Sequence, residues 1–282
     1  MKMKKIAAAL TAATILGSNG ALVVNASAET NAVNITTSTV TEAIVTADGT
    51  IIPEGTTAIS LEIQNNTGFD ISEIQLNVNT SLLFDASGMP IVSVGNVCGD
   101  ATVVAAQEGE NVAITSIASS ICNTDGTLAT VYVSNTASIA VEDAEFRKGS
   151  LTNCDESDIS TCDVEVEWTI GDVNGDEKIT ADDAYIVRNA ISIGQENSEL
   201  KRYGSSSYYY LDGVEVFLNP QKYGFTRKRY AMAADGDENT LLFDCDLQSL
   251  SDVYQILYYY TCTSIGKSYN VSGWYIGEER TF

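Results

Sequence analysis

The stretch that decides how the chain is organised is Asp172-Val-Asn174-Gly-Asp176-Glu-Lys178-Ile-Thr180-Ala-Asp182-Asp183. Oxygen-bearing side chains recur at alternate positions, and the stretch ends on an acid just before an apolar helical pattern. A hard cation such as Ca²⁺ takes about six to eight oxygen ligands, which a loop of about 12 residues supplies from positions 1, 3, 5, 7, 9 and 12. The stretch therefore predicts a calcium loop whose ligands are Asp172, Asn174, Asp176, the Lys178 carbonyl, Thr180 through a water, and Asp183.

Two positions depart from the EF-hand pattern that this spacing follows. Glu177 stands at position 6, where a sharp turn favours Gly, and Asp183 replaces the longer Glu at position 12. Ile179 at position 8 is expected to hold the loop against the core. After the loop, Ala184 and Val187 begin an apolar pattern that predicts a helix over 183–192.

A second copy of the loop lies downstream, at Asp235-Gly-Asp237-Glu-Asn239-Thr-Leu241-Leu-Phe-Asp-Cys-Asp246. Its apolar continuation predicts a helix over 247–260. Asp252-Val-Tyr also resembles Asp183-Ala-Tyr, and in that register the loop carries a six-residue insertion and ends at Asp252. We prefer the shorter loop, so the predicted ligands of the second ion are Asp235, Asp237, Asn239, Leu241 at position 7, and Asp246.

The region before the first loop indicates β structure. Short runs rich in Val, Ile and Thr alternate with polar residues and end at Gly-, Asn- and Asp-containing turns, which is typical of a two-sheet sandwich. Residues 29–170 contain two basic residues against 21 acids, whereas residues 171–282 contain ten against 17, which places a boundary near residue 170. A Tyr- and Ser-rich insertion with little regular structure is expected at 203–230. The strands are predicted at 33–40, 43–46, 57–64, 71–78, 101–105, 112–117, 128–133 and 164–168.

The N-terminus and the overall composition bound the function. Residues 1–28 carry three lysines, an apolar stretch and Ala26-Ser27-Ala28, which predicts a secretory signal peptide cleaved before Glu29. Export permits disulfides, and Cys98–Cys122 and Cys154–Cys162 are possible pairs, with free thiols as the alternative. The chain has 282 residues, no histidine and a formal net charge of −23. These values exclude histidine-based catalysis and disfavour nucleic-acid binding.

Two loops that are each followed, but not preceded, by a helix resemble a dockerin, a small calcium-dependent module that binds a cohesin. The resemblance covers 171–260 and is most specific in Gly171-Asp-Val-Asn-Gly-Asp176. It implies a small all-α module with two EF-hand-like loop–helix motifs, here within residues 171–282. It also implies cohesin contacts at Ala181, Asp182, Arg188 and Asn189, and in the second copy at Asp244 and Cys245.

The first region is similar to a cohesin, which implies a jelly-roll β-sandwich over residues 29–170. The similarity rests on residues 57–64, 72–84 and 126–133, the last reading Gly-Thr-Leu-Ala-Thr-Val-Tyr-Val. It implies that Asn77 and Asn79 contact a dockerin.

Together these resemblances imply a secreted, non-catalytic adaptor scaffoldin in a cellulosome-type complex that degrades polysaccharide at the cell surface. The dockerin is expected to bind two Ca²⁺ ions and a cohesin of another scaffoldin. The cohesin-like domain is expected to bind dockerin-bearing enzymes or proteins, and no membrane span is expected in the mature chain. Two rivals are a carbohydrate-binding sandwich carried on a dockerin and a carboxylate-based glycosidase. The few aromatic residues of the first region disfavour both.

Overall fold

The computed structural model describes residues 21–24, 31–46, 49–135, 138–149, 167–196, 208–211, 214–217, 236 and 250–281. The chain divides into two compact units, the first built mainly from residues up to Lys148 and the second mainly from Gly149 onward. The predicted boundary lay near residue 170.

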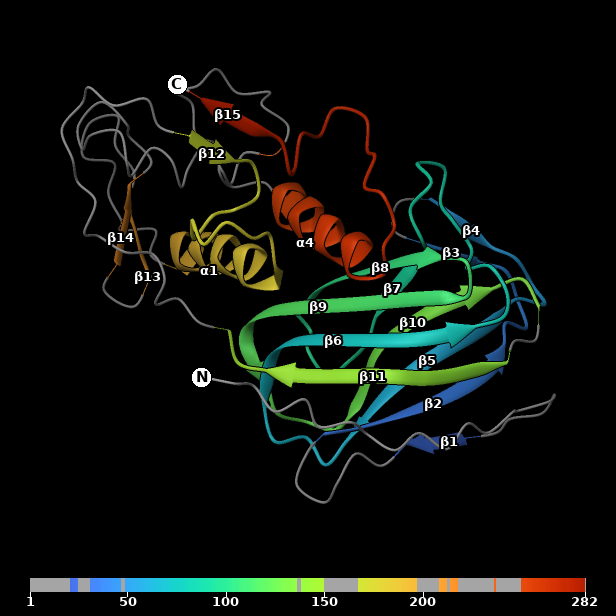
Figure 1. The fold of residues 1–282 in the computed structure, drawn as a ribbon. Coiled ribbons are helices and arrows are strands. Elements are labelled where there is room, and N and C mark those ends of the chain that lie inside the picture. The colour runs from blue at the N-terminus through green and yellow to red at the C-terminus, as the bar shows by residue number, and fades with distance from the viewer. Residues whose placement is uncertain are drawn as a thin grey trace. The chain divides into compact units, whose positions relative to one another are not determined.

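The first unit is a β-sandwich, as predicted (Figure 1). A five-stranded sheet has the order β1-β2-β5-β10-β7, and a four-stranded sheet has the order β11-β6-β9-β8. A hairpin of β3 and β4 lies outside these two sheets. The strands are β1 (Ala21–Val24), β2 (Ala32–Thr39), β3 (Ile44–Val45), β4 (Ile51–Ile52), β5 (Thr57–Gln64), β6 (Phe69–Val78), β7 (Val92–Val94), β8 (Thr102–Glu108), β9 (Asn111–Cys122), β10 (Gly126–Val133) and β11 (Ile139–Arg147).

Alternation of side chains explains why these segments form strands. In the second half of β6, Ile74, Leu76 and Val78 are buried. The residues between them are polar and half-buried. Successive side chains of a strand point to opposite faces, so this half of β6 gives one apolar face to the core and one polar face to the outside.

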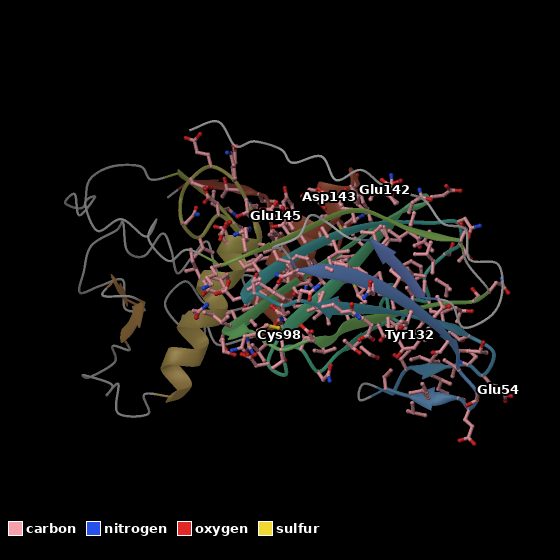
Figure 2. The ribbon with its side chains drawn as sticks, turned by 90° about the horizontal axis from the view of Figure 1, so that it is seen from below. Glu54, Cys98, Tyr132, Glu142, Asp143 and Glu145 are labelled. Carbon is pink, nitrogen blue, oxygen red and sulfur yellow. A yellow bond between two sulfur atoms is a disulfide. The ribbon has the colours of Figure 1, made fainter. Side chains whose placement is uncertain are left out.

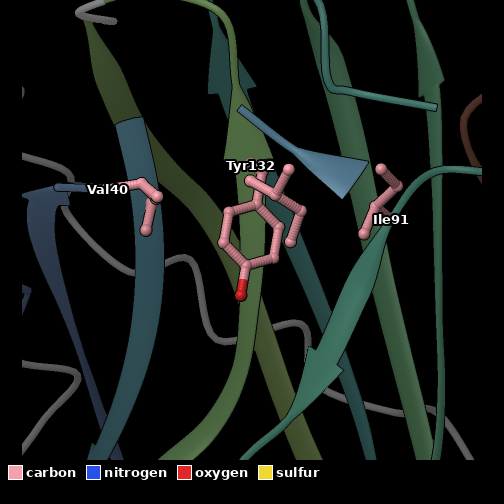
Figure 3. Packing of buried hydrophobic residues seen from close by; sticks show 5 residues of the cluster. Val40, Ile91 and Tyr132 are labelled. Carbon is pink, nitrogen blue, oxygen red and sulfur yellow. The ribbon is translucent and has the colours of Figure 1, made fainter. Parts of the chain in front are cut away.

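A cluster of buried residues closes the core near the β3–β4 hairpin (Figure 3). Tyr132 of β10 lies between Val40 and Ile91, and its hydroxyl is 2.8 Å from the Ser93 hydroxyl. The ring is therefore buried while its polar group keeps a hydrogen-bond partner, which avoids the cost of an unsatisfied buried hydroxyl. Ile52 and Ala58 complete the cluster.

A disulfide joins Cys98 to Cys122 at the end of β9, which is one of the two pairings that the sequence allowed (Figure 2). The bond links residues 24 positions apart. Closing a loop of that length is worth about 3 kcal/mol through the entropy of the unfolded chain. Cys154, Cys162 and Cys245 lie outside the described residues, and Cys262 is buried and forms no disulfide with another described residue.

Within its described residues, the second unit contains two long helices and two short strand pairs. Helix α1 spans Ala181–Glu196 and helix α4 spans Leu250–Ser264, close to the two predicted helices. Strand β12 (Glu167–Thr169) pairs with β15 (Glu279–Thr281), so residues 167 and 168 of the strand expected at 164–168 belong to this unit rather than to the sandwich, and residues 164–166 lie outside the described residues. A hairpin of β13 (Tyr208–Leu211) and β14 (Val214–Phe217) lies in the segment expected to have little regular structure.

Strand β1 lies within the predicted signal peptide and pairs with β2. Cleavage before Glu29 would remove β1 and leave β2 at the edge of a four-stranded sheet. Among the described residues, no helix is both long enough and apolar enough to cross a membrane.

Candidate functional site

The first predicted loop folds around the side chain of Asp172. Its Oδ1 accepts hydrogen bonds from the N–H groups of Gly175 and Asp176 at 2.7 and 3.1 Å, and its Oδ2 accepts one from Glu177 at 3.0 Å. Oδ1 of Asn174 accepts a further bond from the Asp176 N–H at 3.0 Å. Two side chains at ligand positions therefore lie inside the turn, where they organise its backbone.

Asp183 closes the loop from the third residue of α1. Its Oδ1 accepts hydrogen bonds from the N–H groups of Val173 and Asn174 at 2.8 and 3.2 Å, and its Oδ2 accepts one from the Thr180 N–H at 2.8 Å. Burial, with a contribution from the nearby charge of Asp172, raises the pKa of the Asp183 carboxyl from 3.8 to about 7, although the backbone N–H groups oppose the shift. The ionised form is therefore disfavoured unless positive charge is supplied nearby.

Glu177 takes the backbone conformation that the sequence pattern reserves for glycine. Its φ is 67°, and Gly175 two positions earlier has a φ of 74°. The sharp turn of the loop therefore forms despite the missing glycine, at a cost of about 1 kcal/mol for a side chain in the left-handed region.

The donor set of this loop fits a hard cation. Asp172, Asn174 and Asp183 are buried, Thr180 is half-buried, and Asp176 and Lys178 are exposed. No group of three or more acidic or cysteine side chains gathers at metal-ligating distance within the described residues. The loop instead offers two buried carboxylates beside an amide, a hydroxyl and backbone carbonyls, which is the oxygen-rich mixture that Ca²⁺ accepts.

Most of the second predicted loop lies outside the described residues, including Asp235, Asp237, Asn239, Leu241, Asp244, Cys245 and Asp246. Gly236 is described, and its N–H donates to Oδ1 of Asp252 at 3.1 Å. Asp252 is the third residue of α4 and is 4% exposed.

The C-terminal segment contacts the start of both loops. The Ile170 N–H donates to the Glu278 carbonyl at 2.9 Å, and the Tyr275 N–H donates to the Gly236 carbonyl at 2.8 Å. A Cβ on Gly171 or on Gly236 would lie within 3 Å of the Ile276 side chain, so a side chain at either position would have to displace Ile276. Ile276 therefore packs against the first residues of both loops.

The helix residues predicted to contact a cohesin differ in exposure. Ala181 is fully buried, and Asn189 is 9% exposed with its Nδ2 donating to the Tyr185 carbonyl at 2.9 Å. Asp182 and Arg188 are half-buried. Of the four, Asp182 and Arg188 are the two that reach the surface of α1.

The predicted contacts on the sandwich lie at the end of β6. Asn77 is half-buried opposite Ala140 of β11. Asn79 is exposed, and its Oδ1 accepts a hydrogen bond from the Ser138 N–H at 2.8 Å. Asn79 therefore also holds the end of β6 against the start of β11.

The register between β6 and β11 places Asn77 on an acidic face that the sequence did not reveal. Gln75 lies opposite Asp143, and Glu73 lies opposite Glu145. Figure 2 shows Glu142, Asp143 and Glu145 following one another along β11. Arg147 bonds Glu73 at 3.1 Å and is the one basic residue on these two strands. We call Glu73, Gln75, Asn77, Asp143 and Glu145 the acidic face.

Among the described residues of the sandwich, most aromatic side chains are at least partly buried. Phe69 is fully buried and packs on Phe146 with ring centroids 4.9 Å apart. Tyr132 is buried in the core, and Phe84 is 43% exposed.

Comparison with known proteins adds little to this description. No family model and no curated protein matches the chain. Among solved structures it is similar to a non-cellulosomal cohesin from the hyperthermophilic archaeon Archaeoglobus fulgidus, with 16% identity over 33% of this chain and 75% of that chain and a TM-score of 0.24. The β-sandwich is defined by the two sheets described above.

Proposed function

We propose that the protein is a secreted, non-catalytic adaptor whose sandwich binds dockerin-bearing partners and whose second unit is a calcium-dependent dockerin that binds a cohesin. The observation that carries this proposal is the first loop, in which two buried carboxylates organise the turn that leads into α1. Their burial is costly without a cation, and Ca²⁺ bound by the loop would offset it.

On the second unit, Asp182 and Arg188 are the contact positions on α1 that the burial pattern favours. On the sandwich, the acidic face favours a partner with basic contact residues. Charge complementarity of this kind raises the association rate and weakens as salt screens it.

Binding of the mature chain to purified cohesins, purified dockerins and insoluble polysaccharide would test the proposal, each in Ca²⁺ and in chelator. We expect cohesin capture in Ca²⁺ only. Dockerin capture by the sandwich should weaken about tenfold in Glu145→Arg, which corresponds to about 1.4 kcal/mol. The matched control is Glu54→Arg, because Glu54 lies at the opposite end of the sandwich in Figure 2. Retention on polysaccharide without capture of any cohesin or dockerin would overturn the adaptor function in favour of carbohydrate binding.

A further inference from the structure

The two sheets of the sandwich differ in the charge that their strands carry. Strands β2, β5, β7 and β10 of the five-stranded sheet contain a single charged residue, Glu62. In the other sheet, β6 contains two charged residues and β11 contains four. The chain as a whole carries 38 acids, so the five-stranded sheet is an almost neutral part of an acidic protein.

The pairing registers show which side chains of the five-stranded sheet point away from the core. Ile35 of β2 lies opposite Leu61 of β5, and both are buried. Their neighbours in sequence point to the outer face, because successive side chains of a strand alternate between the two faces. Two polar rows cross this outer face, and we call their seven residues the polar face: Asn34, Glu62 and Thr127 in the first row, and Thr36, Ser60, Thr130 and Ser93 in the second.

Hydroxyl groups of the polar face are held in position by hydrogen bonds within it. Oγ of Ser60 lies 2.9 Å from Oγ1 of Thr130, and the Thr127 hydroxyl donates to Oε1 of Glu62 at 2.7 Å. All four residues are half-buried. A hydroxyl has one donor and two acceptor lone pairs, so each pair keeps hydrogen-bonding capacity after its internal bond is made. Groups whose orientation is already fixed lose less entropy when a ligand binds.

Asn34 carries an acceptor that the described part of the chain does not use. The residue is 4% exposed, and its Oδ1 has no hydrogen-bond partner among the described residues. It lies beside Glu62 on one side and beside Val23 of β1 on the other. Removal of β1 with the predicted signal peptide opens the second side, which gives a ligand of the mature chain access to this oxygen. A donor from the ligand would satisfy a carbonyl that is otherwise costly to bury.

We propose that the polar face binds a neutral polysaccharide, whose hydroxyl groups both donate hydrogen bonds to it and accept them from it. A polyhydroxyl chain matches a surface that offers donors and acceptors side by side and almost no charge. A nucleic acid or an acidic polysaccharide would be repelled by a chain with a net charge of −23. The contacts are hydrogen bonds rather than ring stacking, so they need no aromatic platform. The polar face and the acidic face lie on different sheets, and the inference therefore goes beyond the proposed function without resting on it.

Affinity electrophoresis of the mature chain tests the site with two soluble polymers that share one backbone, neutral hydroxyethylcellulose and anionic carboxymethylcellulose, and with neutral glucomannan and arabinoxylan. We expect retardation by at least one neutral polymer and none by carboxymethylcellulose. Thr130→Val and Ser60→Ala should each weaken this binding about three- to tenfold, the usual loss for one hydrogen bond. Thr102→Val, on β8 of the other sheet, is the matched control for Thr130→Val and should bind as the unaltered chain does.

Two further variants separate recognition from stability and from charge. The double variant Ser60→Ala with Thr130→Val replaces both partners of one hydrogen bond by apolar groups, which costs little stability. Its unfolding temperature should therefore stay near that of the unaltered chain, while its binding falls below that of either single variant. Glu62→Gln keeps an acceptor for the Thr127 hydroxyl and removes the charge, so it should bind the neutral polymer at least as well as the unaltered chain.

Absence of retardation by all three neutral polymers would overturn the proposal, as would unchanged retardation in the double variant. Loss of binding in Glu62→Gln, or stronger retardation by carboxymethylcellulose, would overturn the neutral class of ligand. Each of these results leaves dockerin capture intact, because that capture is expected at the acidic face and is measured in the same variants. Polysaccharide binding in a chain that captures neither a cohesin nor a dockerin would instead support the polar face and overturn the adaptor function.

Discussion

The two units bury polar groups in opposite ways. In the sandwich, the buried hydroxyls of Ser72 and Ser116 lie 2.6 Å apart and share a hydrogen bond within an aliphatic core. Among the described residues, the sandwich buries one acid, Asp70, whereas the second unit buries three, Asp172, Asp183 and Asp252.

The two units therefore differ in what stabilises their folded state. The sandwich has hydrophobic burial and a disulfide, neither of which depends on a ligand. The second unit places carboxylates where water is excluded, so its folding is expected to depend on a cation that offsets their charge. The predictions below test this contrast, starting with the largest expected effect.

Removal of Ca²⁺ should unfold the second unit and leave the sandwich folded. If each of two ions is present at about 1,000 times its dissociation constant, together they contribute about 8 kcal/mol to the stability of the second unit. We expect chelation to abolish the helical circular-dichroism signal while the β signal and its cooperative thermal transition persist. A helical signal that survives chelation would show that the two units do not differ in this way.

A substitution in the core of the sandwich should destabilise the sandwich and leave the second unit unaffected. Phe69 is fully buried against Phe146, so Phe69→Ala should destabilise the sandwich by about 3–5 kcal/mol. In saturating Ca²⁺, the unfolding of α1 and α4 should be unchanged when thermal melts are followed in the helical signal. Exposed Phe84→Ala is the matched control, and it should cost far less. An equal loss in both units would indicate that they unfold as one.

The sequence predicted those parts of the fold in which local pattern and tertiary pairing agree. Strand β5 begins and ends at the predicted residues, because its alternation is regular and both ends carry turn signals. Strand β11 was missed because a register shift between Val141 and Asp143 interrupts the alternation. Residues 167 and 168, the described end of the strand predicted at 164–168, pair with β15 at the other end of the chain, and no local pattern reveals that pairing.

The candidate sites likewise include features that the sequence predicted and features that it did not. The spacing of the first loop was visible because its predicted ligand positions all lie within one stretch of 12 residues. The acidic face was not visible, since it depends on the register of β6 against β11. In the second loop, the sequence leaves Asp246 and Asp252 as candidates for the last position, and of these two only Asp252 lies among the described residues.

The pH dependence of the second unit should reverse with Ca²⁺. The pKa of Asp183 is about 7 in the folded chain against a usual 3.8, so the folded state binds a proton that the unfolded state releases between these values. In chelator, stability should therefore fall as pH rises from about 4 to 7, with a loss of about 2 kcal/mol between pH 5 and 7. In saturating Ca²⁺ the slope should have the opposite sign, because protons compete with the cation for the carboxylate. In chelator, the helical circular-dichroism signal at a series of pH values shows whether protonation restores the folded second unit, and in saturating Ca²⁺ urea unfolding midpoints measure the slope. A chelated second unit that gains stability as pH rises, or that retains the slope in Asp183→Asn, would contradict the assignment of this effect to Asp183.

The smallest expected effect concerns the strained turn of the first loop. Glu177→Gly should stabilise the second unit by about 0.5–1 kcal/mol, because glycine adopts a φ of 67° without the steric cost that a side chain imposes there. Lys178→Gly is the matched control, since Lys178 is exposed and is not among the described residues with positive φ, so the added flexibility of the unfolded chain should make this variant less stable. Glu177→Gln removes the charge and keeps the side chain, and it should leave the stability close to that of the unaltered chain. Chemical denaturation in saturating Ca²⁺ resolves all three variants. If Glu177→Gln stabilised the unit as much as Glu177→Gly, crowding of negative charge rather than backbone strain would limit this loop, and the contrast between the two units would then be wholly electrostatic.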